Sequence, residues 1–338
     1  MKIALSGLNN SDNPAPGIGV AKGLEGHTLI GLAYDAAEPG IYQGLFEKVY
    51  MMPYPSLGFE PFYERLKEIK EKSGIEAVIP NLDAELPLYI KYQNEIAKLG
   101  IATYLPTMEQ FESRDKSKLS KLSEELGVLH PKTVEVNTPQ ELATEALAIG
   151  FPLMVKGKYY KAYRVNNIEE ALDAFYKISN EWGFPILLQE VVSGSEINMV
   201  AVSDSKRVLG GVSIKKLMTT ELGKVWSAVT IKNAELEELA AKFVARTGFR
   251  GPFELECIAS KEGLYLIEIN PRFPAWVNFA TMVGVNLPAM VAQLIEGKKP
   301  KECWEYAAEK MYVRYVEELV SDHKKFLELV HKKELSDV

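Results

Sequence analysis

An α/β fold that begins with a Rossmann-like domain is predicted from two patterns in the sequence. Throughout residues 1–112, short apolar runs alternate with amphipathic segments. Strands that alternate with helices form crossover units around a parallel sheet. After residue 190 the pattern changes to longer β-rich runs, which indicates a part with mixed α and β structure. The 338 residues are enough for about two domains of ordinary size.

The elements of the first part can be taken in order. An apolar run over Lys2–Ser6 predicts the first strand, and a loop rich in Gly, Asn and Pro follows it. Residues 59–73 carry apolar side chains at helical spacing and are followed by Gly74, a residue type that commonly terminates helices. The remaining predictions are strands at 27–34, 48–52 and 76–80, a helix that starts near 17, and a helix at 85–99.

The second part predicts a different order of elements. Residues 107–126 have a polar helical pattern, and 131–190 predict strand, helix, strand, helix and strand. The stretch 196–230 is β-rich, and 235–248 predicts a helix. Two apolar runs within 253–269 flank a short polar turn, which predicts a β-hairpin. From residue 287 onward the pattern is mostly helical.

Composition and charge exclude several classes of protein. A net charge of −7 argues against a nucleic-acid binder, and an apolar run long enough to span a membrane is absent from the sequence. Cys257 and Cys303 form no CxxC motif, so we expect two reduced thiols in a cytoplasmic protein. The four histidines are scattered without metal-ligand spacing.

The strongest chemical signal is the run GPFELECIASKEGLYLIEIN at 251–270. In a hairpin, Glu256 and Glu268 lie on adjacent strands, in phase with Glu254 and Asn270. Carboxylates buried among apolar residues require a compensating cation, and oxygen ligands at this density suit Mg²⁺. The spacing alone leaves an equal alternative, a polar stripe that faces solvent on a half-exposed sheet.

The residues that follow the hairpin favour the metal site. Residues 268–272 read E-x-N-P-R, which resembles the metal-binding signature of the ATP-grasp superfamily. The segment 256–300, which includes GVNLPAMVAQLIEGKKP, looks most like the large subunit of carbamoyl-phosphate synthetase and its stand-alone carboxylate–amine ligase relatives. The resemblance implies that Glu256, Glu268 and Asn270 hold Mg²⁺, with Mn²⁺ as an alternative, and that Arg272 contacts the transferring phosphate.

Other landmarks of the superfamily appear in the expected order. The resemblance places Lys116, in R-D-K, and Lys156, at the end of FPLMVK, on the ATP phosphates. Either lysine alone would more simply be a solvated charge. The run LLQEVVSGSE resembles the hinge that holds the nucleoside. The resemblance implies adenine contacts from the segment that contains Gln189, Glu190 and Val192, and ribose contacts from Glu196.

The resemblance also implies a fold and an activity. The fold would be a Rossmann-like pre-ATP-grasp domain at 1–112, a two-lobed α+β ATP-grasp fold with lobes at 113–190 and 191–300, and a helical tail at 301–338. The activity would be amide formation from small-molecule carboxylate and amine substrates through an acyl phosphate, with Mg-ATP between the lobes. The alternatives are a non-catalytic ATP-binding regulator, or carbamoyl-phosphate-synthetase-like phosphorylation of bicarbonate. The resemblance favours a homodimer.

The phosphate loop and the residues that contact the substrate are less clearly indicated by the sequence. The loop at 157–164, which is Gly-rich in the superfamily, has one glycine and several basic residues, so it would clamp phosphates by charge. Asp83 and Glu85 follow a predicted strand at the ligand-binding end of a parallel sheet and could hold a substrate amine, although an acidic helix N-terminus explains them as well. Lys216 could pair with a substrate carboxylate or belong to a surface ion pair.

Overall fold

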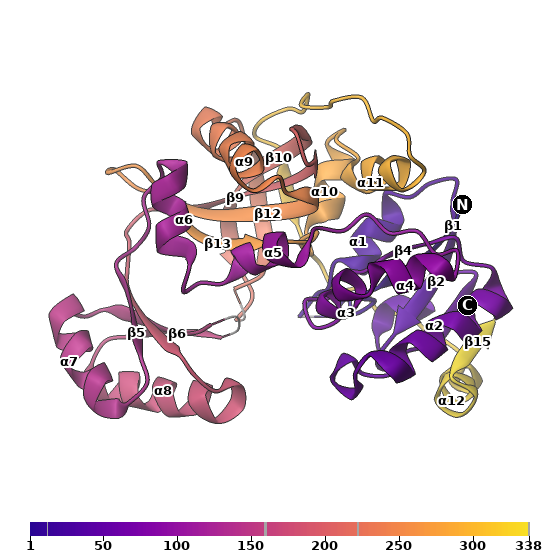
Figure 1. Ribbon diagram of the computed structural model, residues 1–338, viewed down its shortest axis with the longest axis horizontal. Helices are drawn as coiled ribbons and strands as arrows, with labels where there is room; N and C mark the ends of the chain where they lie inside the picture. Colours follow the sequence, from indigo (N-terminus) through magenta and orange to yellow (C-terminus); the bar gives the residue numbers. More distant parts are fainter. Residues whose placement is uncertain (12, 159–160, 222, 337–338) are drawn as a thin grey trace.

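The computed structural model describes residues 1–11, 13–158, 161–221 and 223–336. Figure 1 shows three bodies: an α/β body that holds both termini, a central sheet, and a smaller sheet with two helices that projects from it. Their strand orders are β15-β3-β2-β1-β4, β13-β12-β9-β10-β11-β14 and β5-β8-β6-β7.

The first body is built on parallel strands. β1 (Lys2–Ser6) pairs in parallel with β2 and β4, and β2 pairs in parallel with β3. The other strands are β2 (Thr28–Ala33), β3 (Lys48–Met51) and β4 (Ala77–Ile79). The helices are α1 (Gly17–Lys22), α2 (Phe59–Ser73), α3 (Leu86–Lys91) and α4 (Gln93–Lys98), with 3₁₀ turns at Pro39–Gln43 and Pro55–Leu57.

Of two helices predicted in this body, one is confirmed and the other is divided. α2 buries Phe62, Leu66 and Ile69 and ends at Gly74 in the left-handed conformation, as predicted. The predicted helix at 85–99 is instead the two short helices α3 and α4. They meet at Tyr92, whose backbone leaves the helical region (φ −113°, ψ 24°) while its ring stacks on Phe59.

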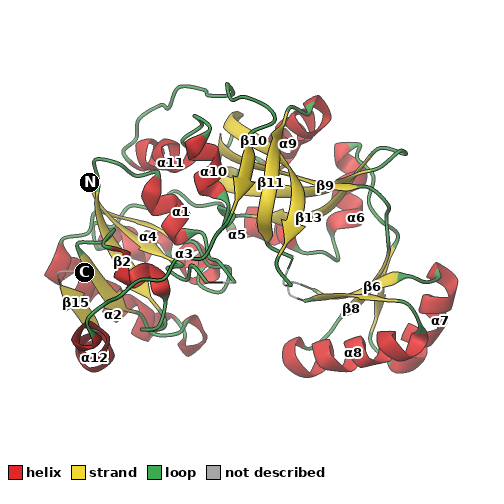
Figure 2. Cartoon of the chain, turned by 180° about the vertical axis from the view of Figure 1, so that it is seen from behind, coloured by secondary structure: helices red, strands yellow, loops and turns green. Residues whose placement is uncertain are grey.

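The small sheet is antiparallel and carries its helices on one face (Figure 2). Its strands are β5 (Thr133–Val136), β6 (Leu153–Gly157), β7 (Ala162–Val165) and β8 (Ile186–Glu190), and its helices are α7 (Pro139–Ile149) and α8 (Ile168–Trp182). β7 was not predicted, because its residues fall in the segment expected to be a phosphate loop. Tyr159 and Tyr160 of that segment lie outside the described residues.

The central sheet is also antiparallel, and its two faces differ. Its strands are β9 (Ser195–Asp204), β10 (Val208–Thr219), β11 (Val225–Ile231), β12 (Arg250–Ala259), β13 (Leu264–Asn270) and β14 (Met311–Val313). Phe253, Leu255 and Cys257 of β12 pack in one core with α6 (Leu119–Leu126) and α9 (Ala234–Thr247). The intervening residues of β12 face the opposite side, and two of them are glutamates.

Two helical predictions in this part were wrong. The helix expected at 107–126 is divided into α5 (Met108–Phe111), a 3₁₀ turn (Glu112–Arg114) and α6. The division falls at Asp115, whose carboxylate accepts the N–H of Ser117 and so competes with helical hydrogen bonding. The tail is less helical than predicted: after α10 (Val277–Met282) and α11 (Leu287–Ile295) it forms loops, β14, α12 (His323–Lys332) and β15 (Glu334–Ser336).

The tail also connects two of the bodies. β14 pairs with β11 at the edge of the central sheet, and β15 pairs antiparallel with β3 in the N-terminal sheet. The loop between them runs across from one body to the other in Figure 2. Within the described residues, the helices are all too short or too polar to cross a membrane.

Candidate active site

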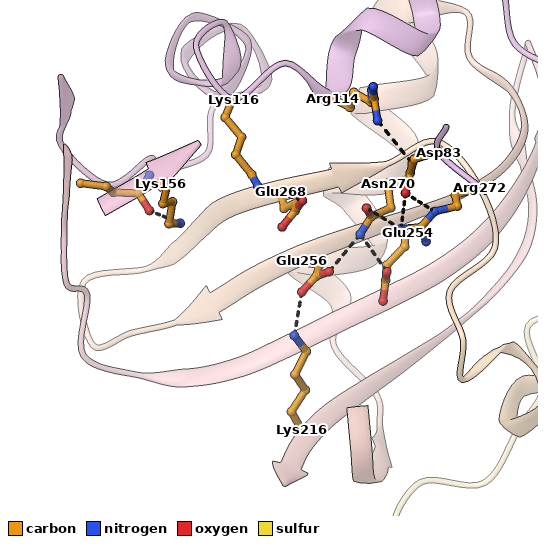
Figure 3. A network of polar contacts seen from close by, with 11 residues as sticks. Asp83, Arg114, Lys116, Lys156, Lys216, Glu254, Glu256, Glu268, Asn270 and Arg272 are labelled. Atoms are coloured by element: carbon orange, nitrogen blue, oxygen red, sulfur yellow. Dashed lines mark hydrogen bonds and ion pairs between the residues drawn. The ribbon is translucent and has the colours of Figure 1, made fainter. Parts of the chain in front are cut away.

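Four polar side chains form a stripe along the hairpin β12–β13. The sequence predicted that these residues lie in phase on adjacent strands, and the strand register pairs Glu254 with Asn270 and Glu256 with Glu268. Figure 3 shows the four side chains on the same side of the two strands. We call Glu254, Glu256, Glu268 and Asn270 the acidic stripe.

The acidic stripe is buried at one end and open at the other. Glu254 is 3% exposed and Asn270 is 9% exposed, whereas the side chain of Glu268 is 33% exposed. The alternative of a solvent-facing polar stripe is therefore wrong for Glu254 and Asn270. Carboxylates this deeply buried require nearby cations or hydrogen-bond donors.

Two ammonium groups supply part of that compensation. The Nζ atom of Lys216 lies 2.7 Å from Oε2 of Glu256 and 3.1 Å from Oε2 of Glu196. The Nζ atom of Lys116 lies 3.1 Å from Oε1 of Glu268. Lys216, on β10, thus lies against the acidic stripe in an ion pair that is not at the surface, since its side chain is 7% exposed. A substrate role for Lys216 stays a prediction.

Hydrogen bonds hold the rest of the stripe in place. Asn270 donates its side-chain N–H groups to Oε2 of Glu254 (3.0 Å) and Oε1 of Glu256 (2.9 Å). Asn198 on β9 and the indole of Trp276 donate to Oε1 of Glu254, at 2.8 and 2.7 Å. Asn198 was not predicted as a site residue, because its place opposite Glu256 depends on the β9–β12 register, which no local pattern in the sequence shows.

The pKa values of Glu254 and Glu256 are shifted in opposite directions. Burial and the neighbouring charge of Glu256 raise the pKa of Glu254. Burial also opposes ionisation of Glu256, but the ammonium group of Lys216 holds its pKa below the usual range. The stripe therefore keeps Glu256 ionised against a cation, while Glu254 acts mainly as a hydrogen-bond acceptor.

The predicted metal ligands have the right chemistry for Mg²⁺. Glu256, Glu268 and Asn270 offer carboxylate and amide oxygens, the ligand types that hard divalent cations prefer. Lys116 and Lys216 already lie against the two carboxylates, so these oxygens favour a cation. Among the described residues, no group of three or more His, Cys, Asp or Glu side chains is gathered as metal ligands, and the metal site stays a prediction.

Lys156 on β6 lies on the opposite side of the site from the acidic stripe (Figure 3). Its Nζ atom donates to Oε1 of Gln189 on β8 at 2.6 Å, and Gln189 donates to the hydroxyl of Thr133 at 2.9 Å. Burial and the nearby charge of Lys116 lower the pKa of Lys156 to about 8. Two repelling ammonium groups from separate elements form a site that favours an anion.

The other predicted nucleotide contacts lie on β8 and β9. Glu190 ends β8 and accepts the backbone N–H of Lys132, and Val192 lies in the loop that follows. Glu196, on β9, lies against Lys216. The structure thus places the predicted hinge next to both Lys156 and the acidic stripe, and the roles of its residues stay predictions.

Arg272 is fixed by a carboxylate from the N-terminal body. Oδ2 of Asp83 accepts from Nε of Arg272 at 2.8 Å and lies 2.8 Å from its Nη2, while Arg114 approaches Oδ1 at 3.4 Å. Burial opposes ionisation of Asp83, but Arg272 and Arg114 lower its pKa. The sequence left Asp83 open between a substrate amine and an acidic helix N-terminus; in the structure its carboxylate lies between two guanidinium groups. The 189 residues between Asp83 and Arg272 left no local signal of this pair.

Glu85 has no exposed surface and is fully engaged within its own body. The hydroxyls of Ser6 and Tyr34 donate to its carboxylate, as do the backbone N–H groups of Asn81 and Leu82. These donors come from the ends of β1, β2 and β4. Glu85 lies at the N-cap of α3, but its side chain makes no capping hydrogen bond to that helix. The carboxylate instead joins the ends of three strands, so neither the substrate amine nor the acidic helix N-terminus describes its contacts.

The expected phosphate loop is anchored by charge. Nζ of Lys158 lies 2.9 Å from Oδ2 of Asp115, the residue before Lys116. Lys161 has a left-handed backbone (φ 65°), and Arg164 lies exposed on β7. Lys158 therefore ties this segment to the loop that carries Lys116.

Residues 184–319 match the family model described as "ATP-grasp in the biosynthetic pathway with Ter operon". The carbamoyl phosphate synthase large chain of Clostridium beijerinckii is 28% identical over 265 residues, which cover 73% of this chain and 24% of that protein. The chain thus spans about a quarter of the length of this relative.

Solved structures resemble the chain over most of its length. An L-amino acid ligase from Bacillus licheniformis has a TM-score of 0.64 at 18% identity, with 86% of this chain and 73% of that chain covered. A biotin carboxylase from Campylobacter jejuni has a TM-score of 0.68 at 16% identity, with 89% and 72% covered. The resemblance seen in the sequence is confirmed: the chain is similar to ATP-grasp proteins and has their mixed α/β fold, built on several sheets.

Proposed function

We propose that the protein is an ATP-dependent carboxylate–amine ligase that forms an amide through an acyl phosphate. One observation carries the proposal: the acidic stripe, with Lys116 against its Glu268 and Lys156 nearby, gathers oxygen ligands and cations in one place, and Arg272 is fixed there by Asp83. Phosphoryl transfer needs positioning and charge neutralisation rather than a covalent nucleophile, and this set of residues provides both.

Each group has a proposed task. Lys116 and Lys156 neutralise the ATP phosphates, and Glu256, Glu268 and Asn270 hold Mg²⁺, or Mn²⁺. The metal, when bound, supplies positive charge to the phosphate oxygens. A substrate carboxylate oxygen attacks the γ-phosphorus and ADP leaves. The amine then attacks the acyl carbon, loses a proton and displaces phosphate, while the fixed guanidinium of Arg272 stabilises the charge on the transferring group.

The nucleoside and the domain division complete the proposal. Gln189, Glu190 and Val192 would lie at the adenine and Glu196 at the ribose. The parallel order β3-β2-β1-β4 supports a Rossmann-like domain at 1–112, followed by lobes at 113–190 and 191–300 and a tail at 301–338. A homodimer in the cytoplasm, acting on small molecules, remains the expectation from sequence.

The test is ADP and phosphate release from Mg-ATP with a panel of carboxylates and amines. We expect release to be stimulated by a carboxylate, and Glu268→Ala to abolish the stimulation. Glu262→Ala is the matched control, since Glu262 lies exposed in the turn of the same hairpin and contacts Tyr265 instead of the acidic stripe. If Glu268→Ala is as active as the control, the assignment of the site is wrong.

A second candidate is nucleotide binding without turnover. It is favoured by the glycine-poor segment at 157–164, which Lys158 ties to Asp115. Tight ATP binding with no stimulation by any carboxylate would support it. Bicarbonate belongs in the same panel, because stimulation by bicarbonate alone would indicate the carbamoyl-phosphate-synthetase-like reaction.

A further inference from the structure

Three cations converge beside the proposed reaction centre. Arg272 follows β13, Lys224 precedes β11, and Arg314 follows β14. The backbone N–H of Arg314 donates to the carbonyl of Trp226 at 2.9 Å, so the chain positions of Arg314 and Lys224 are neighbours across the β11–β14 ladder. We call Lys224, Arg272 and Arg314 the cationic cluster.

Two members of the cationic cluster are held by neutral oxygens. Nζ of Lys224 donates to the carbonyl of Pro14 at 2.9 Å. The guanidinium of Arg314 donates to Oδ1 of Asn10 and to the carbonyl of Ala275, both at 3.0 Å, and its buried Nε atom has no hydrogen-bond partner among the described residues. Among the residues that the structure describes, neither Lys224 nor Arg314 forms an ion pair with a carboxylate.

The cluster therefore carries excess positive charge. The carboxylates that act on Lys224 are those of Asp83 and Glu254. Asp83 is paired with Arg272, and Glu254 is hydrogen-bonded within the acidic stripe. Burial, together with the charges of Arg272 and Arg314, lowers the pKa of Lys224 to about 8. An anion placed here would relieve this repulsion and satisfy the open donor.

A cavity of about 270 Å³ lies at the carboxyl ends of β1, β2 and β4. Its lining includes Asn9, Ala15 and Leu82 and the carboxylates of Asp35 and Glu38, whereas the three cations of the cluster lie outside its lining. Ligands of open parallel sheets bind at that edge. The contacts of the cationic cluster lie one residue along the chain from this lining. Lys224 contacts Pro14, next to Ala15; Arg314 contacts Asn10, next to Asn9; and Arg272 contacts Asp83, next to Leu82.

We propose that Lys224 and Arg314 bind a second anionic group of the carboxylate substrate, so that the preferred substrate is a dicarboxylic or phosphorylated acid. This inference rests on the proposed function, in which Arg272 attends the carboxylate that becomes phosphorylated. Because Arg272 belongs to the same cluster, a substrate with two anionic groups can place one at the reaction centre and the other between Lys224 and Arg314. An acid with a single carboxylate leaves Lys224 and Arg314 without a counter-charge.

The first test compares substrates that differ in one anionic group: succinate against butanoate, glutamate against glutamine, and O-phosphoserine against serine. We expect the dianionic member of at least one pair to be preferred, and the active pair separates a carboxylate from a phosphate. Lys224→Gln, which keeps a donor for Pro14, should raise the KM for that acid about 10- to 100-fold and leave the KM for ATP unchanged. Arg314→Gln should act in the same direction.

Lys232→Gln is the matched control, because Lys232 flanks the other end of β11 and also donates to a backbone carbonyl, that of Trp304 at 2.8 Å. It should change neither KM. Equal use of both members of every pair, or a KM for the acid that Lys224→Gln leaves unchanged, overturns the proposal.

A second readout does not depend on turnover. Millimolar malonate should raise the Tm of the wild type more than acetate does, and Lys224→Gln should lose that difference while its Tm without ligand stays at or above that of the wild type. If no acid stimulates ADP release, the proposed function fails by itself. If malonate acts no differently from acetate on the wild type, the anion site fails whatever the outcome for ADP release.

Discussion

Replacing Lys156 by methionine should stabilise the free protein and weaken nucleotide binding. The side chain is 8% exposed, and its pKa falls from 10.5 to about 8 through burial and repulsion by Lys116. This fall corresponds to about 3 kcal/mol of unfolding free energy lost when the buried ammonium is kept charged. Methionine removes that charge at similar volume but leaves Oε1 of Gln189 without its donor, at a cost of about 1 kcal/mol.

The expected net effect depends on pH in a defined direction. Because the folded pKa of Lys156 lies below the unfolded value, the loss of stability is fully present below pH 8 and is relieved as pH rises from about 8 to 10.5. Lys156→Met should therefore raise the unfolding free energy by about 2 kcal/mol at pH 7, and the gain should shrink toward pH 10. Without a positive charge for the phosphates, the Kd for ATP should rise about 10- to 100-fold.

Urea unfolding at pH 7 and pH 9.5, with and without ATP, measures both effects. Lys177→Met is the control, since Lys177 is exposed on α8 in the same body and its substitution should change stability by less than about 0.5 kcal/mol. A variant at Lys156 that is less stable than wild type at pH 7, or that binds ATP as tightly, would refute the reasoning that an anion site holds this lysine charged.

Further predictions concern the carboxylates. Asp83→Asn should lower kcat about tenfold or more with little change in the Kd for ATP, because Arg272 loses its fixed orientation; steady-state kinetics beside nucleotide titration checks this. Glu85→Gln should lower the unfolding free energy by about 1–3 kcal/mol in urea, since four donors lose a shared carboxylate, while the substrate KM of the surviving enzyme stays the same. Mg²⁺ with ADP should raise the Tm of the wild type, and Glu268→Gln should lose the contribution of the metal in a thermal scan with and without EDTA.

The hairpin that bears the acidic stripe was predictable because its determinants are local. Alternation of apolar and polar residues along β12 sets which face each side chain occupies. A β-bulge between Glu256 and Cys257, which no local pattern indicated, shifts the register between the turn and the glutamates. The alternation in the sequence therefore predicted that Glu256 and Glu268 lie on adjacent strands in phase with Glu254 and Asn270, and the structure agrees; the direct pairing of Glu256 with Glu268 comes from the structure. The end of α2 at Gly74 was predictable for the same reason, because an amphipathic run and a left-handed glycine are both local signals.

The environment of the hairpin was not predictable, because it depends on contacts between distant segments. The pairing of Lys216 with Glu256 requires strands β10 and β12 to lie on either side of β9. The pairing of Asp83 with Arg272 joins the N-terminal body to the central sheet. A single sequence shows the charged residues but not which of them form pairs. For this reason Asp83, the partner of Arg272, looked like a carboxylate that could bind a substrate amine.

The tail shows how such distant contacts connect structure to specificity. Its edge strands β14 and β15 are three residues each, too short to give a periodic signal, yet they attach the tail to two sheets. Arg314, immediately after β14, reaches Asn10 in the loop that follows β1, and Lys224 reaches Pro14 in the same loop. The loop that borders the cavity is therefore held by two cations whose charge is not neutralised by the protein. It follows that the acid which neutralises them would bind the tail, the central sheet and the N-terminal body at once, and that substrate binding would order all three around Arg272.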